Sequence, residues 1–319
     1  MRRIGVLTSG GDAPGMNAAI RAVVRVAYVN GIQVYGIMDG YSGLINGDMR
    51  VLTRRDVSGI AQRGGTILHT ARCPEFKTEE GRRKAVLNLK ENGIEGVVAI
   101  GGDGTFQGAH LLSQLGIPTI GVPATIDNDL AYTDYCIGFD TAINTVVSSI
   151  GKIRDTMDSH GRVGVIEVMG RHCGDIALFS GVACGAEAVL IPEFKWDIDD
   201  IAQKLRNRDE MGVQSAIIVV AEGAGDAEDI AKQLIERTGL DIRSTVLGHV
   251  QRGGDPTAND STLAARLAGR AVELLRDGKE NRVVGIINNH IRDYDITEAL
   301  AASKKHHTKL YRLAYDLAF

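Results

Sequence analysis

The chain has 319 residues, 44% of them hydrophobic and 24% charged, and a formal net charge of −4. This is the composition of an ordinary globular protein, and the length allows either two domains of ordinary size or one large domain. No basic excess favours nucleic acid or an anionic membrane as a partner, and no apolar run reaches the ~18 residues of a membrane-spanning helix.

Four cysteines, at positions 73, 136, 173 and 184, show neither a paired metal spacing nor a disulfide framework. Reduced thiols are therefore expected. Residues 1–3 (Met-Arg-Arg) lead directly into an apolar segment, which is not the pattern of a signal peptide. We expect a cytoplasmic protein with neither nucleic acid nor membrane as a partner.

Strand and helix patterns alternate along the chain. Strands are predicted over residues 4–7, 34–37, 97–100, 117–123, 163–168, 186–191, 215–221 and 283–287. Helices are predicted over residues 16–28, 56–63, 79–92, 106–115, 140–155, 175–185, 199–208, 229–238 and 261–275. The alternation argues for an α/β protein with parallel sheets. No linker marks a domain boundary.

A glycine-rich segment, residues 9–15, follows the first predicted strand and precedes the first predicted helix. This strand–turn–helix order is typical of nucleotide binding. However, neither the dinucleotide spacing of glycines nor the P-loop pattern with its lysine is present. Any ATP would therefore be held without a Walker lysine.

The segment Val97–Thr105 reads as a buried strand that runs into a glycine turn, Gly-Gly-Asp-Gly-Thr. The predicted helix after it would direct free N–H groups and a positive dipole end at the turn, which favours a phosphate. A carboxylate and a phosphate repel each other. Asp103 therefore predicts a Mg²⁺ ion between the two, because Mg²⁺ prefers hard oxygen ligands.

A second apolar strand, residues 117–123, leads to Thr125, Asp127 and Asp129. Alternate acidic residues after a strand end offer one candidate base and one candidate metal or structural partner. Ligands of open α/β sheets bind outside the carboxyl ends of strands, where both motifs fall. Each turn alone is more typical of an ordinary strand–helix turn with a capping Asp, but together they favour a phosphate and metal site.

These motifs resemble the bacterial ATP-dependent 6-phosphofructokinases. The resemblance rests on GGDGT at 101–105, PATIDND at 123–129, GVLTSGGDAPGMN at 5–17, RCPEF at 72–76, EVMGR at 167–171 and GHVQRGG at 248–254. It implies phosphoryl transfer from ATP, with Mg²⁺, to the 1-hydroxyl of fructose 6-phosphate, giving fructose 1,6-bisphosphate and ADP in glycolysis.

The resemblance also implies the architecture. It predicts two Rossmann-like three-layer domains with mostly parallel sheets and an active site in the cleft between them. The larger, ATP-binding domain is expected over residues 1–138 plus 251–304, and the smaller, sugar-phosphate-binding domain over 139–250 plus 305–319. A homotetramer with active sites shared between subunits is the expected assembly.

Phosphoryl transfer needs positioning, charge neutralisation and a base for the attacking hydroxyl. The resemblance assigns catalysis to Asp127 as the base, with Arg72, Thr125 and Arg171. It gives Asp129 no more than a supporting role. The ATP side is expected to comprise Gly11, Arg72, Cys73, Gly102, Asp103, Gly104 and Thr105, with Asp103 at the Mg²⁺ position. Cys73 is expected to be a backbone or packing contact, because the reaction needs no covalent intermediate.

The sugar-phosphate side combines arginines, whose forked donors suit a phosphate's paired oxygens, with Glu222, which suits sugar hydroxyls. The expected residues are Thr125, Ile126, Asp127, Arg162, Met169, Gly170, Arg171, Glu222, Arg243, His249, Val250, Gln251 and Arg252. The resemblance implies that Arg162 and Arg243 reach this site from a neighbouring subunit.

A second, allosteric site for ADP or an inhibitor is also implied by the family. The matching residues are Arg21, Arg25, Arg54, Arg154, Gly185 and Glu187. However, Met211 and Val213 stand where the family has a basic pair, and Gly59 stands at a frequent Asp position. Each lost cation weakens anion binding by roughly 1 kcal/mol or more, so a weak effector response is expected.

The phosphoryl donor and the reaction class each have alternatives. The family usually has Ser and Gly at the positions of Thr105 and Ala124, which are small changes. Pyrophosphate-dependent relatives carry Asp at 104 and Lys at 124, so Gly104 and Ala124 favour ATP. The alternatives are another GGDGT kinase, acting on NAD or a lipid, and a catalytically inactive nucleotide or sugar-phosphate sensor.

The C-terminal stretch from Lys304 contains the adjacent His306 and His307. Solvated surface or a subunit contact is the expected role of the pair, and a metal site is the less favoured alternative.

Overall fold

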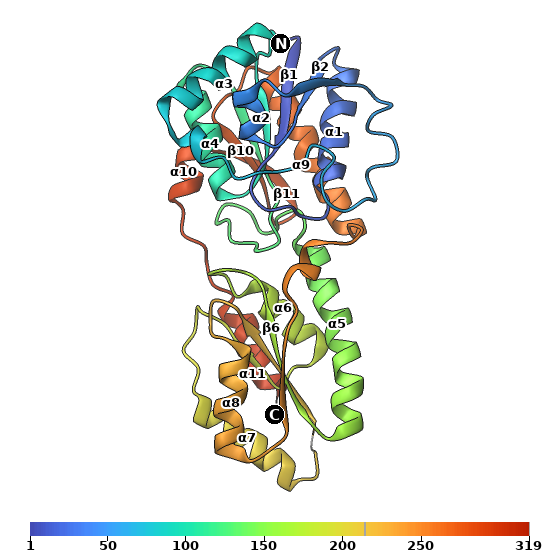
Figure 1. The fold of residues 1–319 in the computed structure, drawn as a ribbon, viewed down its shortest axis with the longest axis vertical. Coiled ribbons are helices and arrows are strands. Elements are labelled where there is room, and N and C mark those ends of the chain that lie inside the picture. Colours follow the sequence, from blue (N-terminus) through green and yellow to red (C-terminus); the bar gives the residue numbers. More distant parts are fainter. Residues whose placement is uncertain (214, 319) are drawn as a thin grey trace. The chain divides into compact units, whose positions relative to one another are not determined.

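The computed structural model describes residues 1–213 and 215–318. The chain divides into two compact units (Figure 1). Unit 1 comprises Met1–Ile126, Leu130–Thr141 and Arg252–Lys304; unit 2 comprises Asp127–Asp129, Ala142–Gln251 and the residues from Lys305 onward. Each unit is built on its own sheet, so the expected α/β class with two mostly parallel sheets is confirmed.

The sheet of unit 1 has seven strands in the order β11-β10-β5-β4-β1-β2-β3. The strands are β1 (Arg3–Thr8), β2 (Gln33–Ile37), β3 (Met49–Leu52), β4 (Val97–Gly101), β5 (Thr119–Pro123), β10 (Arg282–Ile287) and β11 (His290–Asp295). The inner strands are parallel, whereas β3 and β11 pair antiparallel at the two edges. All residues of β4 and β5 are buried, as unbroken apolar runs require when a sheet is covered on both faces.

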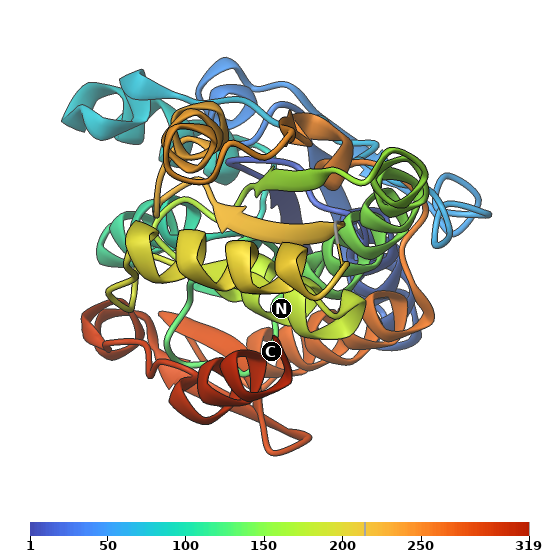
Figure 2. The same ribbon diagram turned by 90° about the horizontal axis from the view of Figure 1, so that it is seen from below.

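Helices cover both faces of this sheet. They are α1 (Met16–Val29), α2 (Tyr41–Asn46), α3 (Glu79–Glu91), α4 (Asp103–Gln114), α9 (Ala258–Arg276) and α10 (Ile296–Ala301), with a 3₁₀ turn, η1 (Pro74–Lys77). α1 and α9 lie side by side on one face (Figures 1 and 2). On the other face, Leu44, Phe76, Leu89 and Phe106 share one core cluster with residues of β1 and β4. Unit 1 is thus a three-layer arrangement.

The sheet of unit 2 has four parallel strands in the order β7-β8-β6-β9. They are β6 (Val163–Val168), β7 (Ala188–Leu190), β8 (Ala216–Ala221) and β9 (Ile242–Val246). The helices are α5 (Phe139–His160), α6 (Asp175–Cys184), α7 (Ile198–Glu210), α8 (Ala227–Thr238) and α11 (Thr308–Ala318), with a 3₁₀ turn, η2 (Gly248–Arg252). α6 packs with α11, and α7 packs with α8 over a second core cluster.

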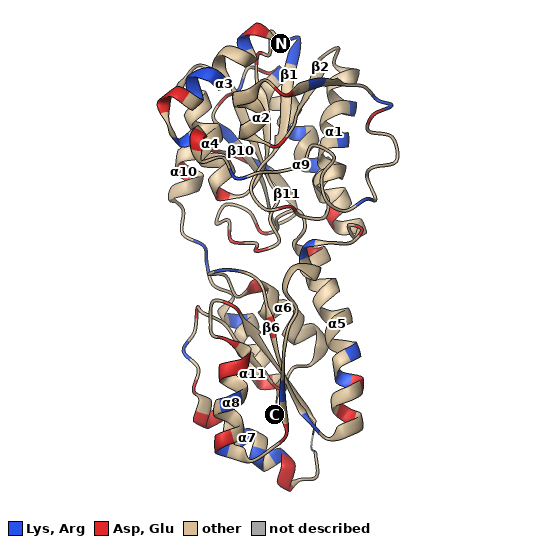
Figure 3. Cartoon of the chain, viewed as in Figure 1, with Lys and Arg blue, Asp and Glu red and all other residues tan. Residues whose placement is uncertain are grey.

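Helix α3 has its charged residues on the solvent-exposed face, as its sequence predicts. The buried residues of α3 are Gly81, Ala85 and Leu89. They are four positions apart, so they lie along one face of the helix. Figure 3 shows lysines, arginines and acidic residues spread over the rest of α3. Within the described residues, no helix is long and apolar enough to cross a membrane.

Several predicted elements are wrong in detail. Residues 56–63 form turns rather than a helix, because Gly59 has a φ of 72°, in the left-handed region that interrupts a helix. α4 begins at Asp103 instead of at position 106, and β7 covers three residues rather than six. α2, β3, β9, β11, α10 and α11 were not predicted from the sequence.

Candidate active site

The two glycine-rich turns of unit 1 follow neighbouring strands. β1 and β4 are adjacent and parallel, with Leu7 opposite Ala99. The chain order reverses between them, because β2 and β3 lie beyond β1, and β5 lies beyond β4. Ligands of open α/β sheets bind at such a reversal, outside the carboxyl ends of the strands. The sheet topology therefore brings the turns after Thr8 and Gly101 to one edge.

Hydrogen bonds join the turns at this edge. The Oγ1 atom of Thr105, a buried residue, donates to the carbonyl of Ser9 over 3.0 Å. The Oγ1 atom of Thr70 donates to the carbonyl of Gly10 over 2.8 Å. A Cβ on Gly101 would lie only 2.4 Å from the Ser9 carbonyl oxygen, so glycine is required for this close approach. Thr105 thus acts as the bridge between the turns.

Asp103 is the first residue of α4 and is exposed. Its Oδ2 accepts a hydrogen bond of 2.9 Å from Nε2 of Gln107, one helical turn later. Gly104 has open space around it, with no atom within 4 Å of an added Cβ. A single oriented carboxylate at a helix N-terminus, with room beside it, fits Mg²⁺, which takes one or two protein carboxylates and completes its shell with water and phosphate oxygens.

Arg72 and Cys73 lie in the segment that Thr70 ties to the Gly10 turn. Arg72 is exposed. Cys73 is half-buried, precedes η1 and packs against the core cluster that contains Phe76. The side chain of Cys73 therefore packs against the core of unit 1.

Arg252 reaches the first glycine turn of the same unit. Its Nη1 donates to the carbonyl of Asp12 over 3.2 Å. A Cβ on Gly11 would lie 2.6 Å from the same nitrogen. Two residues predicted to serve different substrates, Gly11 for ATP and Arg252 for the sugar phosphate, are therefore in direct proximity.

In unit 2 the predicted sugar-phosphate residues gather at the carboxyl ends of β6 and β8. Oε1 of Glu222 accepts hydrogen bonds from the amides of Gly170 (3.1 Å) and Arg171 (2.6 Å). Both donors have positive φ values, 136° and 55°, and their successive N–H groups converge on this one oxygen. The two bonds fix the carboxylate of Glu222.

The buried side chain of Gln251 completes this region, because its Oε1 accepts a 3.2 Å bond from the amide of Met169. His249 and Val250, which precede it in η2, are exposed. η2 thus anchors Gln251 and presents its two neighbours to solvent.

Asp127 belongs to unit 2 and is buried, with 3% of its surface exposed. Its Oδ2 lies 3.8 Å from Nε of Arg171, whose side chain is mostly exposed. Thr125 and Ile126, the preceding residues, belong to unit 1, where the Cβ of Thr125 lies 3.8 Å from the position of a Cβ on Gly102.

Arg162 and Arg243 lie elsewhere in unit 2. Both bind Asp241, whose Oδ2 is 2.6 Å from Nε of Arg162 and whose Oδ1 is 3.0 Å from Nε of Arg243. Arg162 precedes β6, whereas Arg171 follows it, and six strand residues span about 20 Å. Within one chain these arginines are therefore separated from the residues around Glu222. The side-chain bond from Arg162 lowers the pKa of Asp241, a partner that sequence spacing did not reveal.

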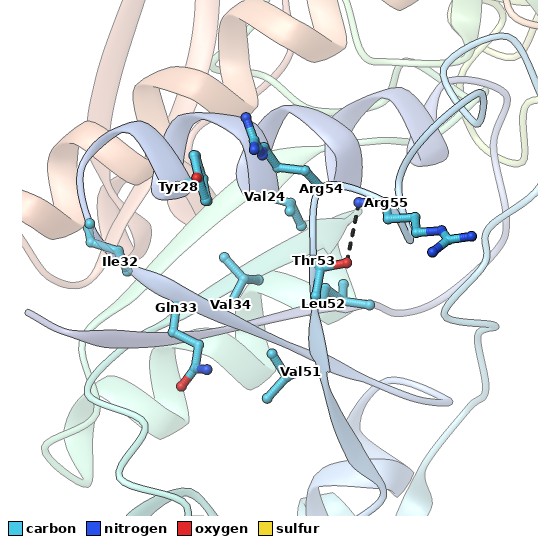
Figure 4. A pocket seen from close by; sticks show the side chains of 11 residues that line it. Val24, Tyr28, Ile32, Gln33, Val34, Val51, Leu52, Thr53, Arg54 and Arg55 are labelled. Carbon is cyan, nitrogen blue, oxygen red and sulfur yellow. Dashed lines mark hydrogen bonds between the residues drawn. The ribbon is translucent and has the colours of Figure 1, made fainter.

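Arg54, one of the predicted allosteric residues, lines a cavity of about 590 Å³ between α1, β2 and β3 (Figure 4). Arg21 and Arg25, on α1, are not among the described residues that line it. The guanidinium of Arg54 lies 4.1 Å from the ring centroid of Tyr28, and Arg55 also lines the cavity. Arg25 donates to the carbonyl of Arg54 over 3.4 Å. The Nε atom of Arg25 is buried and has no hydrogen-bond partner among the described residues.

In unit 2 the remaining allosteric candidates are engaged with one another or with the chain. Nη2 of Arg154 donates to the carbonyl of Gly185 over 3.1 Å. Glu187 is buried and forms an ion pair of 3.1 Å with Arg208. The side chains of Met211 and Val213 are exposed. No basic side chain from these two positions is therefore available to an anion.

Comparison with known proteins gives a consistent result over the whole chain. The family model described as "Phosphofructokinase" matches residues 3–275. The chain is 59% identical over 319 residues to "ATP-dependent 6-phosphofructokinase" of Clostridium tetani and 57% identical over 320 residues to the protein of that name from Bacillus pumilus. Both alignments cover 100% of this chain and of the relative.

Solved structures agree on the fold. Phosphofructokinase from Saccharomyces cerevisiae superposes with a TM-score of 0.90 at 36% identity, and the match covers 100% of this chain and 48% of the yeast chain. This chain thus spans about half of the yeast chain's length. A pyrophosphate-dependent phosphofructokinase from Marinobacter aquaeolei has a TM-score of 0.87 at 23% identity, covering 97% of this chain and 86% of the other.

Proposed function

Because this chain belongs to the phosphofructokinase family, we propose that it transfers the γ-phosphoryl group of ATP to the 1-hydroxyl of fructose 6-phosphate, giving ADP and fructose 1,6-bisphosphate. ATP-dependent phosphofructokinase activity in glycolysis follows from the full-length identity of 57–59% to proteins of that name.

Asp127 is the proposed general base. The 3.8 Å approach of Arg171 to this buried carboxyl group supports the role, because it places a carboxyl group, the kind of side chain that can accept the proton of the attacking hydroxyl, beside a cation that can bind an anionic substrate. Arg171 and Arg72 then face the charge on the transferring group, and Thr125 orients the substrate. The other residues predicted for the sugar-phosphate side supply binding.

Asp103 is the proposed Mg²⁺ ligand, with Gln107 holding its carboxylate. The ion would neutralise charge on the phosphate oxygens of ATP. Gly11, Gly102, Gly104 and Thr105 allow the backbone to approach the nucleotide. The open space at Gly104 supports ATP rather than pyrophosphate as the donor, because a side chain there would occupy the volume beyond the transferring phosphoryl group.

Two further proposals concern assembly and regulation. Arg162 and Arg243 serve the phosphate site of a neighbouring subunit in a homotetramer. The location of the two arginines supports this proposal. Arg162 precedes β6 and Arg243 pairs with Gly164 near its start, whereas Arg171 follows its end. The effector response is weak, because Met211 and Val213 offer no cation. A sigmoidal fructose 6-phosphate curve that ADP straightens at micromolar concentration would contradict the weak response.

The direct test is a coupled assay of ADP release with fructose 6-phosphate, on the wild type and on Asp127→Asn. We expect the variant to lose several orders of magnitude in kcat while it still binds both substrates. Asp200→Asn, on the exposed face of α7, is the matched control and should be as active as wild type. Turnover near the wild-type value in Asp127→Asn would exclude that residue as the base. Activity with NAD or a lipid instead of fructose 6-phosphate would favour the alternative kinases.

A further inference from the structure

The tripeptide that contains Asp127 is anchored through its middle residue. Asp127–Asp129 belong to unit 2, although the residues on either side belong to unit 1. Nδ2 of Asn128 donates a hydrogen bond of 2.9 Å to Oδ2 of Asp175. Asn128 is 1% exposed and Asp175 is 4% exposed, and a buried bond to a carboxylate is stronger than one between neutral groups. This bond holds the tripeptide against unit 2.

The backbone conformation at position 128 also restricts which residue types fit there. Its φ is 52°, in the left-handed region. Asn adopts this conformation more readily than most side chains, and Gly adopts it without strain. Asn128 therefore supports the turn through its backbone and anchors it through its side chain. These two contributions can be separated by substitution.

Asp175 is itself held by the C-terminal segment. It is the first residue of α6, where the helix dipole favours a negative charge. Nε2 of His307 lies 3.5 Å from the same Oδ2 atom that binds Asn128. The His307 ring also packs edge-on against Phe179 of α6, with centroids 5.2 Å apart. His307 therefore contacts its own chain, whereas the expectation was solvated surface or a subunit contact.

We infer that Asn128 and Asp175 are positioning residues that set the orientation of Asp127, and that His307 supports Asp175. The inference rests on the proposed role of Asp127 as the base. A general base works only at hydrogen-bond distance from the proton that it removes. A misplacement of about 1 Å can cost about a hundredfold in rate. Loss of the Asn128 anchor should therefore reduce turnover more than substrate binding.

The test is steady-state kinetics of Asn128→Gly, which keeps the backbone conformation and removes only the side-chain anchor. We expect kcat to fall about tenfold to a hundredfold, with both KM values within about threefold of wild type. The melting temperature should fall, because the buried Asp175 carboxylate loses a partner, but the variant should stay folded at the assay temperature, which circular dichroism checks. Asp175→Asn keeps an oxygen that can accept from Asn128 and should be more active than Asp175→Ala.

His307→Ala is compared with His306→Ala, because His306 packs against Phe194 instead of Asp175. Only the former should lower kcat. The inference fails if Asn128→Gly turns over at the wild-type rate, or if its loss of kcat is matched by a proportional rise in KM. Asp127→Asn separates this failure from that of the proposed function: if it is inactive while Asn128→Gly is fully active, only the positioning role is refuted.

Discussion

Nη1 of Arg252 donates a hydrogen bond to the carbonyl of Asp12, a residue 240 positions earlier in the sequence. The same nitrogen lies over Gly11, whose missing side chain leaves room for it. The position of Arg252 is thus coupled to the glycine turn after β1. This coupling makes Gly11 important for a residue that we assign to the other substrate.

Gly11→Ala should therefore impair fructose 6-phosphate binding. An added Cβ would lie 2.6 Å from Nη1, so the Arg252 guanidinium must move. If Arg252 binds the phosphate of fructose 6-phosphate as proposed, its displacement weakens that charge-assisted hydrogen bond. Such a bond contributes about 1.5–3 kcal/mol, so we expect KM for fructose 6-phosphate to rise about tenfold or more. Initial-rate kinetics checks this. Gly151→Ala, in α5, where the added Cβ meets nothing within 4 Å, is the matched control.

Substitution of Gly104 should change the use of ATP without harming the fold. Gly104→Ala should stabilise α4 by about 0.5–1 kcal/mol, because glycine is unfavourable within a helix. Gly104→Asp should fold equally well but lower kcat/KM for ATP strongly, since its carboxylate would repel the nucleotide phosphates. Thermal melting and ATP kinetics on the same two variants separate the effects. An Asp variant with unchanged ATP kinetics would place the nucleotide elsewhere.

Shared active sites predict complementation between two inactive variants. Asp127→Asn lacks the proposed base, and Arg162→Ala combined with Arg243→Ala lacks the arginines proposed to serve a neighbour. Mixed tetramers, formed by dissociation and reassembly of the two proteins, should contain some sites with all three residues and regain part of the activity. Each variant treated alone is the control. Inactive mixed tetramers of confirmed composition would mean that Arg162 and Arg243 act elsewhere.

The ion pairs of Asp241 should make a pH-dependent contribution to stability. The hydrogen bond from Arg162 lowers the pKa of Asp241 in the folded chain relative to its unfolded value. Its contribution is therefore present above an unfolded pKa of about 3.9 and is lost as the pH falls through the lower folded pKa. We expect Asp241→Asn to melt below wild type at about pH 7, and the difference to vanish on acidification. Melting curves followed by circular dichroism from neutral pH downward check this; a constant difference would argue against the ion pairs.

Burial explains which parts of the fold could be predicted. β4 and β5 are buried on both faces, so their largely apolar sequences identified them. β9 was missed because Arg243, Ser244 and Thr245 are not buried and show no apolar pattern. The start of α4 was placed too late because its first turn contains Gly104, which reads as a loop residue although it lies inside the helix.

Sequence motifs predicted the site residues, but they did not predict the contacts that hold those residues in place. Gln107 lies four residues after Asp103, a helical spacing that could have indicated their hydrogen bond. Asn128 and Asp175 are separated by 47 residues, and no local pattern relates them. Such pairs are set by the packing of distant segments. The catalytic and binding roles themselves stay predictions until the variants are measured.

The strand order of unit 1 has a consequence for synthesis of the chain on the ribosome. β10 lies between β5 and β11, yet it is formed by residues 282–287, long after β5 has been translated. Until then one side of β5, a wholly buried strand, has no neighbour. Unpaired strand edges of this kind promote association between unfinished chains. Nascent chains that stop before residue 282 should therefore depend most strongly on chaperones.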